Sequence, residues 1–454
     1  MMQLLEYIRS VQVDDRPLTR AQLEAIHERY RSAAAPFNGR HALLQDVYRR
    51  VPGADRILAA LPPRLADIRA VLRPQEAVIY MARVDDDYLR FLITPETTRF
   101  VHTRDDEAAV RRLVAAMIAN LTPTAGGGYG TFDRATSHAL YKLTIAPLAA
   151  DLKLVRRLVW IGPDALAGLS PEVFTDEHGT LLFERYTVTL SASLRDFVDS
   201  RAARSPKAPG GLSLLAVAAP QSSAADIACL TAGECAAPDA GRRFRSAGSG
   251  TMALAPLPET ASEMLALRDA LAPVKTQLLL GPEARVPNLL QAVKGARCDL
   301  VAFATHGVPG DRLESIGLTE PALLLGLPAD GRPSFLSASE IAALDLAGSP
   351  VVVLSACDTA RASNGSVYFD SLSGFYQAFR LAGARGVVAT QWEVASDAAE
   401  RLVPDFVRRV REGDEFALAL RNAKIRLRDE APAALRHPGY WMPFAFLGHG
   451  GGSL

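Results

Sequence analysis

The chain has 454 residues, 49% of them hydrophobic, which is a globular composition in a chain too long for one ordinary core. Lys and Arg together number 50, as do Asp and Glu, so the net charge of zero gives no electrostatic reason to expect nucleic acid or an acidic membrane as a partner. The four cysteines are too few for a disulfide framework and their spacing fits no zinc site, so we expect neither a metal nor a cofactor. No apolar run could span a bilayer and the N-terminus lacks the features of a secretory signal, which favours a cytoplasmic protein.

Changes in composition divide the chain into three parts. Residues 1–55 space their apolar side chains helically and predict a short helical N-terminal segment. Residues 56–205 and 206–454 are expected to form two α/β subdomains, and the Pro- and Gly-rich residues 201–211 are the candidate linker. Residues 221–258 are rich in Ala, Gly, Ser and Pro and predict an exposed loop.

The first subdomain begins with a mixed pattern. Residues 77–81 and 89–93 predict paired strands across the acidic turn at 85–87. Residues 108–121 predict an amphipathic helix, and 154–161 predict a strand that stops at a Gly-Pro pair.

The second subdomain alternates short apolar runs with amphipathic segments. This alternation predicts an α/β fold with a mainly parallel sheet and right-handed crossovers. The expected strands are 212–218, 277–280, the apolar runs within 301–307 and 351–359, and 386–390. The expected helices are 262–271, 286–294, 337–344, one capped by Asp370 or Ser371 and ending at Gly383, 397–411 and 414–430.

Two of these apolar runs end in a reactive side chain. The run in 301–307 ends at His306, and the run in 351–359 ends at Cys357. Ligands of an open α/β sheet bind beyond the carboxyl ends of its strands, so these two residues could meet there as a nucleophile and its base. A free cysteine in an apolar strand is most often a small core residue. Cys357 differs because it ends its strand and is followed by the polar Asp358.

Five motifs follow one another along the second half of the chain: FATHG, LSACDTA, SGFYQAFRLAGARGVVATQW, ALALRNAKIRL and HPGYWMPFAFLG. In this order and spacing they resemble the CHAT domain, a caspase-like family related to caspases and separases. Similar family segments occur upstream, and the resemblance covers roughly residues 60–450. It implies a caspase-like, open and mainly parallel sheet flanked by helices, preceded by a degenerate caspase-like subdomain. Many members carry an earlier histidine in the first catalytic strand, where this chain has Ala302.

The resemblance also implies an activity. It assigns His306 as the catalytic histidine and Cys357 as the nucleophile of a cysteine endopeptidase. The backbone N–H groups of Gly307 and Cys357 would form the oxyanion hole, because glycine lets the backbone approach a substrate oxygen closely. We expect a protein substrate, an activating partner protein or signal, and a place in bacterial defence or cell-death-like signalling. A catalytically silent scaffold is the alternative, and a small-molecule hydrolase using the same pair is a third interpretation.

Four further residues are candidates for the substrate pocket. Ser355 and Asp358 flank the nucleophile. Trp392 directly follows a predicted strand and could be either a core residue or a pocket wall. Asp397 begins a predicted helix, where an acid suits the helix dipole; the alternative is an acidic pocket floor that selects Lys or Arg before the cleaved bond.

Overall fold

The computed structural model describes most of the chain beyond its N-terminal segment. The described residues are 63–84, 87–124, 128–202, 212–220, 227, 257–295, 297–310, 313, 318–326, 334–346, 348–356 and 368–452. The predicted helical segment 1–55, most of the predicted linker and most of the predicted loop 221–258 lie outside them. From Arg64 onward the chain belongs to one compact unit.

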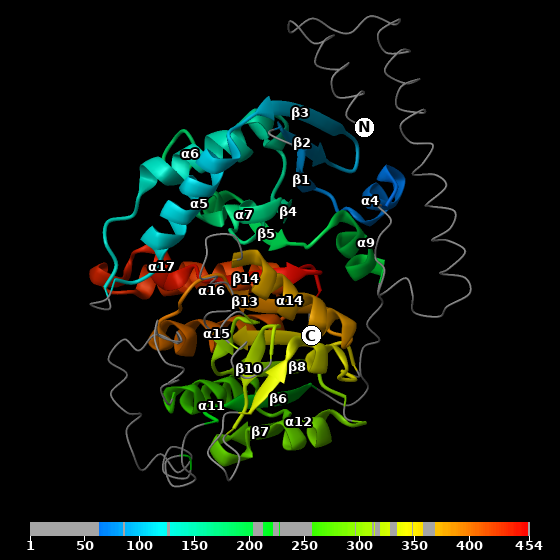
Figure 1. Cartoon of the computed structure of the whole chain (residues 1–454), viewed down its shortest axis with the longest axis vertical. Coiled ribbons are helices and arrows are strands. Elements are labelled where there is room, and N and C mark those ends of the chain that lie inside the picture. The colour runs from blue at the N-terminus through cyan, green and yellow to red at the C-terminus, as the bar shows by residue number, and fades with distance from the viewer. Residues whose placement is uncertain are drawn as a thin grey trace, which may run out of the picture. The chain divides into compact units, whose positions relative to one another are not determined.

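A large sheet runs through this unit. Its strands are β1 (Glu76–Val84), β2 (Asp87–Ile93), β3 (Thr98–Arg104), β4 (Arg157–Ile161), β5 (Thr187–Leu190), β6 (Ser213–Ala218), β7 (Lys275–Leu280), β8 (Leu300–Ala304), β12 (Val351–Ser355), β13 (Gly386–Thr390) and β14 (Phe444–Gly448). Their order across the sheet is β3-β2-β1-β4-β5-β14-β13-β12-β8-β6-β7, and Figure 1 shows the sheet passing from the first half of the chain into the second. A smaller sheet joins β9 (Gly307–Val308), β10 (Ala322–Leu324) and β11 (Phe335–Ser337).

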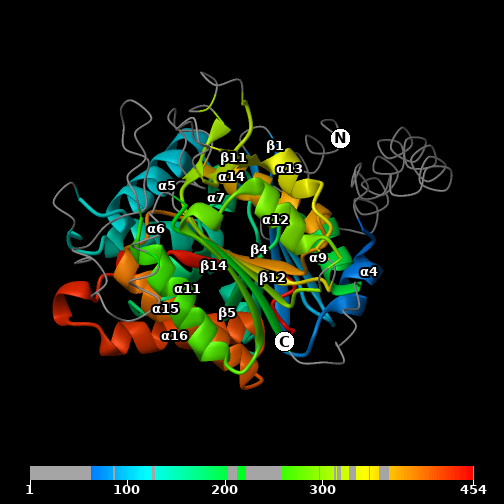
Figure 2. The ribbon, with the colours of Figure 1, turned by 90° about the horizontal axis from the view of Figure 1, so that it is seen from below.

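Helices cover both faces of the large sheet. The α-helices are α4 (Leu65–Val71), α5 (Glu107–Leu121), α6 (Arg134–Thr144), α7 (Asp164–Ala167), α8 (Leu182–Arg185), α9 (Leu194–Ala202), α11 (Glu259–Leu271), α12 (Val286–Val293), α13 (Ala338–Ala342), α14 (Tyr368–Leu381), α15 (Ser396–Arg411), α16 (Phe416–Glu430) and α17 (Pro438–Trp441). Short 3-10 turns lie at η1 (Ala146–Leu152), η2 (Pro171–Val173), η3 (Gly281–Glu283) and η6 (Ala433–Leu435). In the second half, α11, α15 and α16 lie on one face and α12, α13 and α14 on the other (Figure 2). No helix in the described part of the chain is long and apolar enough to cross a membrane.

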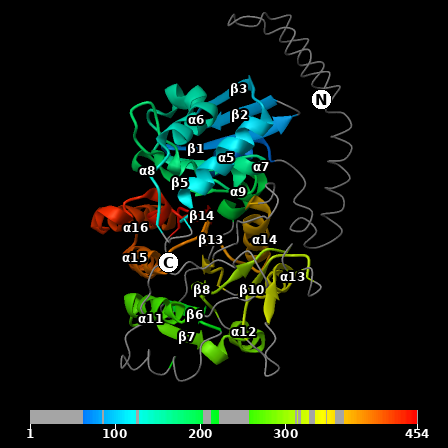
Figure 3. The same ribbon diagram turned by 60° about the vertical axis from the view of Figure 1, so that its left-hand side comes forward.

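The second half supplies five neighbouring parallel strands, β13, β12, β8, β6 and β7. Every residue of β8, β12 and β13 is buried, as expected for parallel strands covered on both faces. The strand β14 pairs antiparallel to β13 and parallel to β5, so it joins the two halves of the sheet (Figure 3). The expected α/β fold with a mainly parallel sheet is confirmed.

Most of the predicted elements match the structure within a few residues. The strands β1 and β2 pair with Tyr80 opposite Phe91, and β4, β6, β7, β8, β12 and β13 lie where the apolar runs predicted them. The helices α5, α11, α12, α13, α15 and α16 are also confirmed. The cap at Asp370 is wrong, because α14 begins at Tyr368 and Asp370 lies inside the helix. An acidic residue near a helix start suits either the cap or the first turn, so a cap at Asp370 places the helix start three residues too late.

Candidate active site

The two strands that precede the predicted catalytic residues are neighbours in the large sheet. The strands β8 and β12 are parallel neighbours, and their last paired residues are Ala304 and Ser355. His306 follows Ala304 by two positions, and Cys357 follows Ser355 by two positions. Cys357 and Asp358 lie outside the described residues, so their predicted roles stay predictions.

The chain around His306 is held by a short hairpin. The Thr305 hydroxyl donates to the carbonyl of Leu324 over 2.8 Å, and the Leu324 N–H donates to the carbonyl of His306 over 2.9 Å. His306 is 2% exposed, so the hairpin fixes a histidine that is largely shielded from water. The backbone at His306 is therefore held by one main-chain hydrogen bond and by the Thr305 hydroxyl.

The same hairpin leaves the predicted oxyanion donor pointing away from its partner strand. Gly307 lies opposite Leu323, and the next pair, His306 and Leu324, is hydrogen-bonded. Residues facing each other in an antiparallel ladder alternate between bonded and non-bonded pairs. Gly307 is thus in a non-bonded pair, and its N–H is not used by the β9–β10 ladder.

Two buried carboxylates lie beside the strand ends, and sequence reasoning missed both. Glu263 accepts a hydrogen bond from the Ser355 hydroxyl over 3.4 Å, and Glu259 accepts one from the Ser396 hydroxyl over 3.1 Å. Both glutamates are fully buried on α11. Their positions carried a signal, because they continue at four-residue steps the apolar stripe that ends in Leu271. An acid in the line of a buried stripe needs a hydrogen-bonding partner, and here each glutamate has a serine hydroxyl.

The predicted pocket residues Trp392 and Asp397 both contact α17. The Trp392 side chain is 5% exposed, and its Nε1–H donates to the carbonyl of Gly439 over 3.2 Å. Asp397 Oδ2 accepts a hydrogen bond from the Tyr440 hydroxyl over 2.8 Å, while Oδ1 is buried with no hydrogen-bond partner in the described residues. The preceding Gln391 donates to the carbonyl of Gly168, so its amide contacts the first half of the chain. That Trp392 and Asp397 contact the substrate stays a prediction.

Cys298 shows what a structural cysteine looks like in this chain. It is 6% exposed just before β8, and burial, together with the charge of Asp299, raises the pKa of its thiol. A thiol with a raised pKa is a poor nucleophile at neutral pH. Cys298 is therefore a core residue and a reference against which Cys357 can be measured.

The carboxyl-terminal side of β8 and β12 carries groups that can take part in acid–base chemistry. It holds an imidazole, two buried carboxylates and hydroxyl groups at the ends of parallel strands. Within the described ranges, no three His, Cys, Asp or Glu side chains are grouped so that they could hold a metal ion.

Comparison with known proteins extends this description. The model of the CHAT domain family matches residues 134–449. No curated protein sequence matches the chain. Among solved structures, the Arg-specific cysteine proteinase gingipain R (RGPB) is similar over 77% of this chain and 76% of its own, with 11% identity and a TM-score of 0.40. The separase–securin complex of Saccharomyces cerevisiae is similar over 87% of this chain and 31% of its own, with 9% identity and a TM-score of 0.47.

Proposed function

The chain belongs to the CHAT domain family, and from this premise we propose that it is a cysteine endopeptidase that cleaves a protein substrate with Cys357 and His306. The single observation that supports it best is the register of β8 and β12. Ala304 and Ser355 are paired at the ends of the two strands, and in the sequence His306 and Cys357 each follow by two positions. Ligands of such sheets bind beyond the carboxyl ends of parallel strands, which supports the proposal that both residues belong to one site.

The proposed reaction has two stages. His306 takes the proton of the Cys357 thiol, the resulting thiolate attacks the peptide carbonyl, and the oxyanion is stabilised by the N–H groups of Gly307 and Cys357. His306 gives a proton to the leaving amine as the C–N bond breaks, which leaves an acyl-thioenzyme. His306 then takes a proton from water, the resulting hydroxide attacks the thioester, and the thiol and a new carboxyl end are released.

We further propose that acidic side chains select a basic residue before the cleaved bond. Asp397 carries a buried carboxylate oxygen without a hydrogen-bond partner in the described residues, and Glu259 carries another. A Lys or Arg side chain before the cleaved bond would supply the missing donors. Ser355, Asp358 and Trp392 belong to the same proposed pocket.

The test is an unbiased peptide-library cleavage profile of the full chain. Wild type and the Cys298→Ala control should both cut after Lys or Arg, and Cys357→Ala should give no cleavage above background. Cleavage that survives Cys357→Ala would refute the nucleophile. A wild type that cuts neither the library nor casein, with or without cell extract as a source of activator, would leave the silent scaffold as the better interpretation.

Control by an activating partner or signal completes the proposal. A protease in a defence or cell-death-like pathway must be inactive until an activating signal arrives. The extract arm of the same experiment checks this point: an increase in cleavage on adding extract supports regulation, and full activity of the purified chain alone argues against it.

A further inference from the structure

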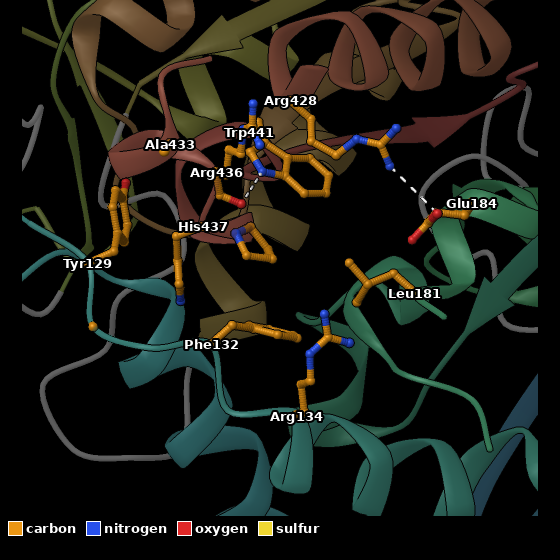
Figure 4. A pocket seen from close by; sticks show the side chains of 12 residues that line it. Tyr129, Phe132, Arg134, Leu181, Glu184, Arg428, Ala433, Arg436, His437 and Trp441 are labelled. Atoms are coloured by element: carbon orange, nitrogen blue, oxygen red, sulfur yellow. Dashed lines mark hydrogen bonds and ion pairs between the residues drawn. The ribbon is translucent and has the colours of Figure 1, made fainter. Parts of the chain in front are cut away.

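A hollow of about 480 Å³ lies away from the candidate active site. Figure 4 shows side chains converging on it from the α5–α6 connection and α8 on one side, and from the end of α16 and α17 on the other. Its volume falls in the range of small-molecule sites. Its lining consists of Tyr129, Gly130, Phe132, Arg134, Leu181, Glu184, Arg428, Ala433, Arg436, His437, Pro438 and Trp441.

The lining carries an excess of positive charge. The lining contains three arginines, Arg134, Arg428 and Arg436, and one carboxylate, that of Glu184. The Glu184 carboxylate lies 3.7 Å from the Arg428 guanidinium. The guanidinium groups of Arg134 and Arg436 donate to main-chain carbonyl oxygens. Neither forms an ion pair with a carboxylate in the described part of the chain. The hollow therefore favours an anion, and arginine suits the geometry of a phosphate.

His437 adds an unsatisfied donor to the same place. Its Nδ1 accepts the N–H of Gly439 over 3.1 Å, so the proton of the neutral ring sits on Nε2. This Nε2 is buried and has no acceptor among the described residues. Burial lowers the pKa of His437 to about 4, so the ring stays neutral at pH 7. A buried donor without an acceptor is costly, and an oxygen of a bound ligand would remove that cost.

Aromatic and aliphatic side chains form the rest of the wall. The Tyr129 ring stacks on His437 with centroids 5.1 Å apart and planes at 14°, and Phe132 meets His437 edge-on at 5.8 Å. Leu181 and Trp441 complete an apolar side (Figure 4). A flat, apolar ring system fits such a wall, because aromatic faces and edges attract one another. The ligand should thus combine an anionic group with a planar ring.

A nucleotide has both parts. We propose that the hollow binds a nucleoside monophosphate, with its phosphate on Arg134, Arg436 and the His437 Nε2–H and its base on the apolar side, and that this binding alters the candidate active site by shifting α17. The second clause rests on the proposed peptidase function, and the first does not.

The route through α17 is short. Gly439 accepts hydrogen bonds at its carbonyl from Tyr129, which lines the hollow, and from Trp392, which belongs to the proposed substrate pocket. One residue further, the Tyr440 hydroxyl donates to Asp397. A Cβ at Gly439 would lie 2.3 Å from a backbone oxygen, so α17 is packed too tightly to move without its neighbours. A ligand that shifts α17 must also shift the groups bonded to it.

Binding is tested by calorimetry on the full chain at fixed, moderate ionic strength, with AMP, GMP, CMP, UMP, adenosine and inorganic phosphate as probes. At least one monophosphate should bind ten or more times more tightly than inorganic phosphate and than adenosine. If no phosphate-bearing probe binds with a Kd below about 1 mM, the site is refuted. If inorganic phosphate binds as tightly as every nucleotide, the nucleotide assignment is refuted.

Variants locate the site. Arg436→Gln and His437→Phe should each weaken nucleotide binding about tenfold or more, since each removes a donor to a charged group. Arg112→Gln is the matched control, because Arg112 is an exposed arginine on α5 whose ion pair with Asp106 lies outside the hollow. Thermal unfolding verifies that each variant is folded; Arg436 is exposed, so its substitution tests the site even if His437→Phe does not fold. Equal affinity in Arg436→Gln and Arg112→Gln would refute the placement.

The coupling has its own readout. Saturating nucleotide should change kcat/KM for peptide cleavage at least about fivefold in either direction. Tyr440→Phe breaks the contact with Asp397 but leaves the lining intact, so it should bind nucleotide normally and lose this response. An unchanged cleavage rate in wild type would refute the coupling, whereas nucleotide binding is tested separately by the calorimetry. Absence of cleavage with and without nucleotide would instead refute the proposed peptidase function.

Discussion

The two halves of the large sheet differ in direction and in what their strands deliver. The strand β14 is antiparallel to β13 and parallel to β5, so β1, β4 and β5 run opposite to β6, β8, β12 and β13. The carboxyl ends of β4 and β5 therefore lie at the opposite edge from those of β8 and β12. The two sets of strand ends can be compared as two possible sites in one sheet.

In the described part of the chain, the two sets of strand ends carry different groups. Beyond β4, a Cβ at Gly162 would lie 2.9 Å from the backbone of Leu166, and Trp160 donates to the carbonyl of Leu166. Beyond β5, the Ser191 hydroxyl donates to Asp196 over 2.7 Å. These ends are closed by their own packing and hydrogen bonds. The carboxyl ends of β8 and β12 instead lie beside His306 and the buried Glu263, so the two sets of parallel strands differ in the residues placed just past them.

The largest expected effect is the loss of activity on replacing His306, which follows β8. His306→Gln should lower kcat/KM about 10²- to 10⁴-fold, the usual contribution of a general acid–base group, with thermal unfolding unchanged. The matched control is His138→Gln in the first half, where the imidazole Nδ1 contacts the carbonyl of Thr175. Continuous cleavage of a fluorogenic peptide measures both. Equal activity of the two variants would remove His306 from the chemistry.

A second substitution tests whether the two halves fold as one. Lys424 on α16 forms an ion pair of 2.7 Å with Glu172 of the first half, and both side chains are almost fully buried. Lys424→Met should cost about 3–5 kcal/mol in the free energy of unfolding, because it leaves an uncompensated buried charge. The exposed Arg112→Met should cost less than about 1 kcal/mol. Urea unfolding measures both.

The double variant Glu172→Leu with Lys424→Met makes this test sharper. Removing both charges together should restore most of the lost stability. If Lys424→Met alone is as stable as wild type, the ion pair does not join the halves.

The next effect concerns specificity. Asp397→Asn should reduce the preference for Lys or Arg before the cleaved bond about 10- to 100-fold, which corresponds to losing one hydrogen bond to a charged group. The control is Asp151→Asn, an exposed acid paired with Arg99 in the first half. Paired cleavage of peptides that differ only at this position gives the ratio. A library profile identical to wild type would exclude Asp397 from the pocket.

The smallest effect is on acid stability at the junction of the halves. Burial, and then the charges of Arg201 and Arg73, lower the pKa of His449 to about 3, and Arg73 donates to its Nε2 over 3.0 Å. In the unfolded chain this imidazole titrates near its ordinary value of 6.5. The unfolded state therefore binds more protons between these values, and the stability present above pH 6.5 is lost as the pH falls toward 3.

His449→Gln should weaken this pH dependence. The difference in urea midpoint between pH 7 and pH 4.5 should be smaller in the variant than in wild type. An equal or larger difference would show that His449 does not titrate in this way.

The fold of the second half was largely predictable because its signals are local. Continuous apolar runs predicted the buried strands, and His306 stood out because it ended one of them. By contrast, β3 was not predicted: its sequence is polar and its residues are largely exposed, so no apolar pattern marks it. No strand was assigned to β14 either, since pairing with both β13 and β5 is a property of the assembled sheet and not of the segment.

The site was predictable only in part. His306 could be assigned from its strand, whereas Glu259 and Glu263 were missed. A glutamate on a helix is normally taken as solvent-facing, and these two are recognised as buried only when the apolar four-residue spacing along α11 is traced. The bond between Tyr440 and Asp397 joins residues that are far apart in the sequence, and only the fold reveals it.

The most direct test of the proposed nucleophile is covalent trapping. The full chain is treated with a peptidyl acyloxymethyl ketone ending in Arg, and the modified cysteine is identified by mass spectrometry of its peptides. We expect a single adduct on Cys357, formed much more slowly in His306→Gln, with the buried Cys298 unmodified. An unmodified Cys357 under conditions in which the same preparation cleaves peptides would contradict it.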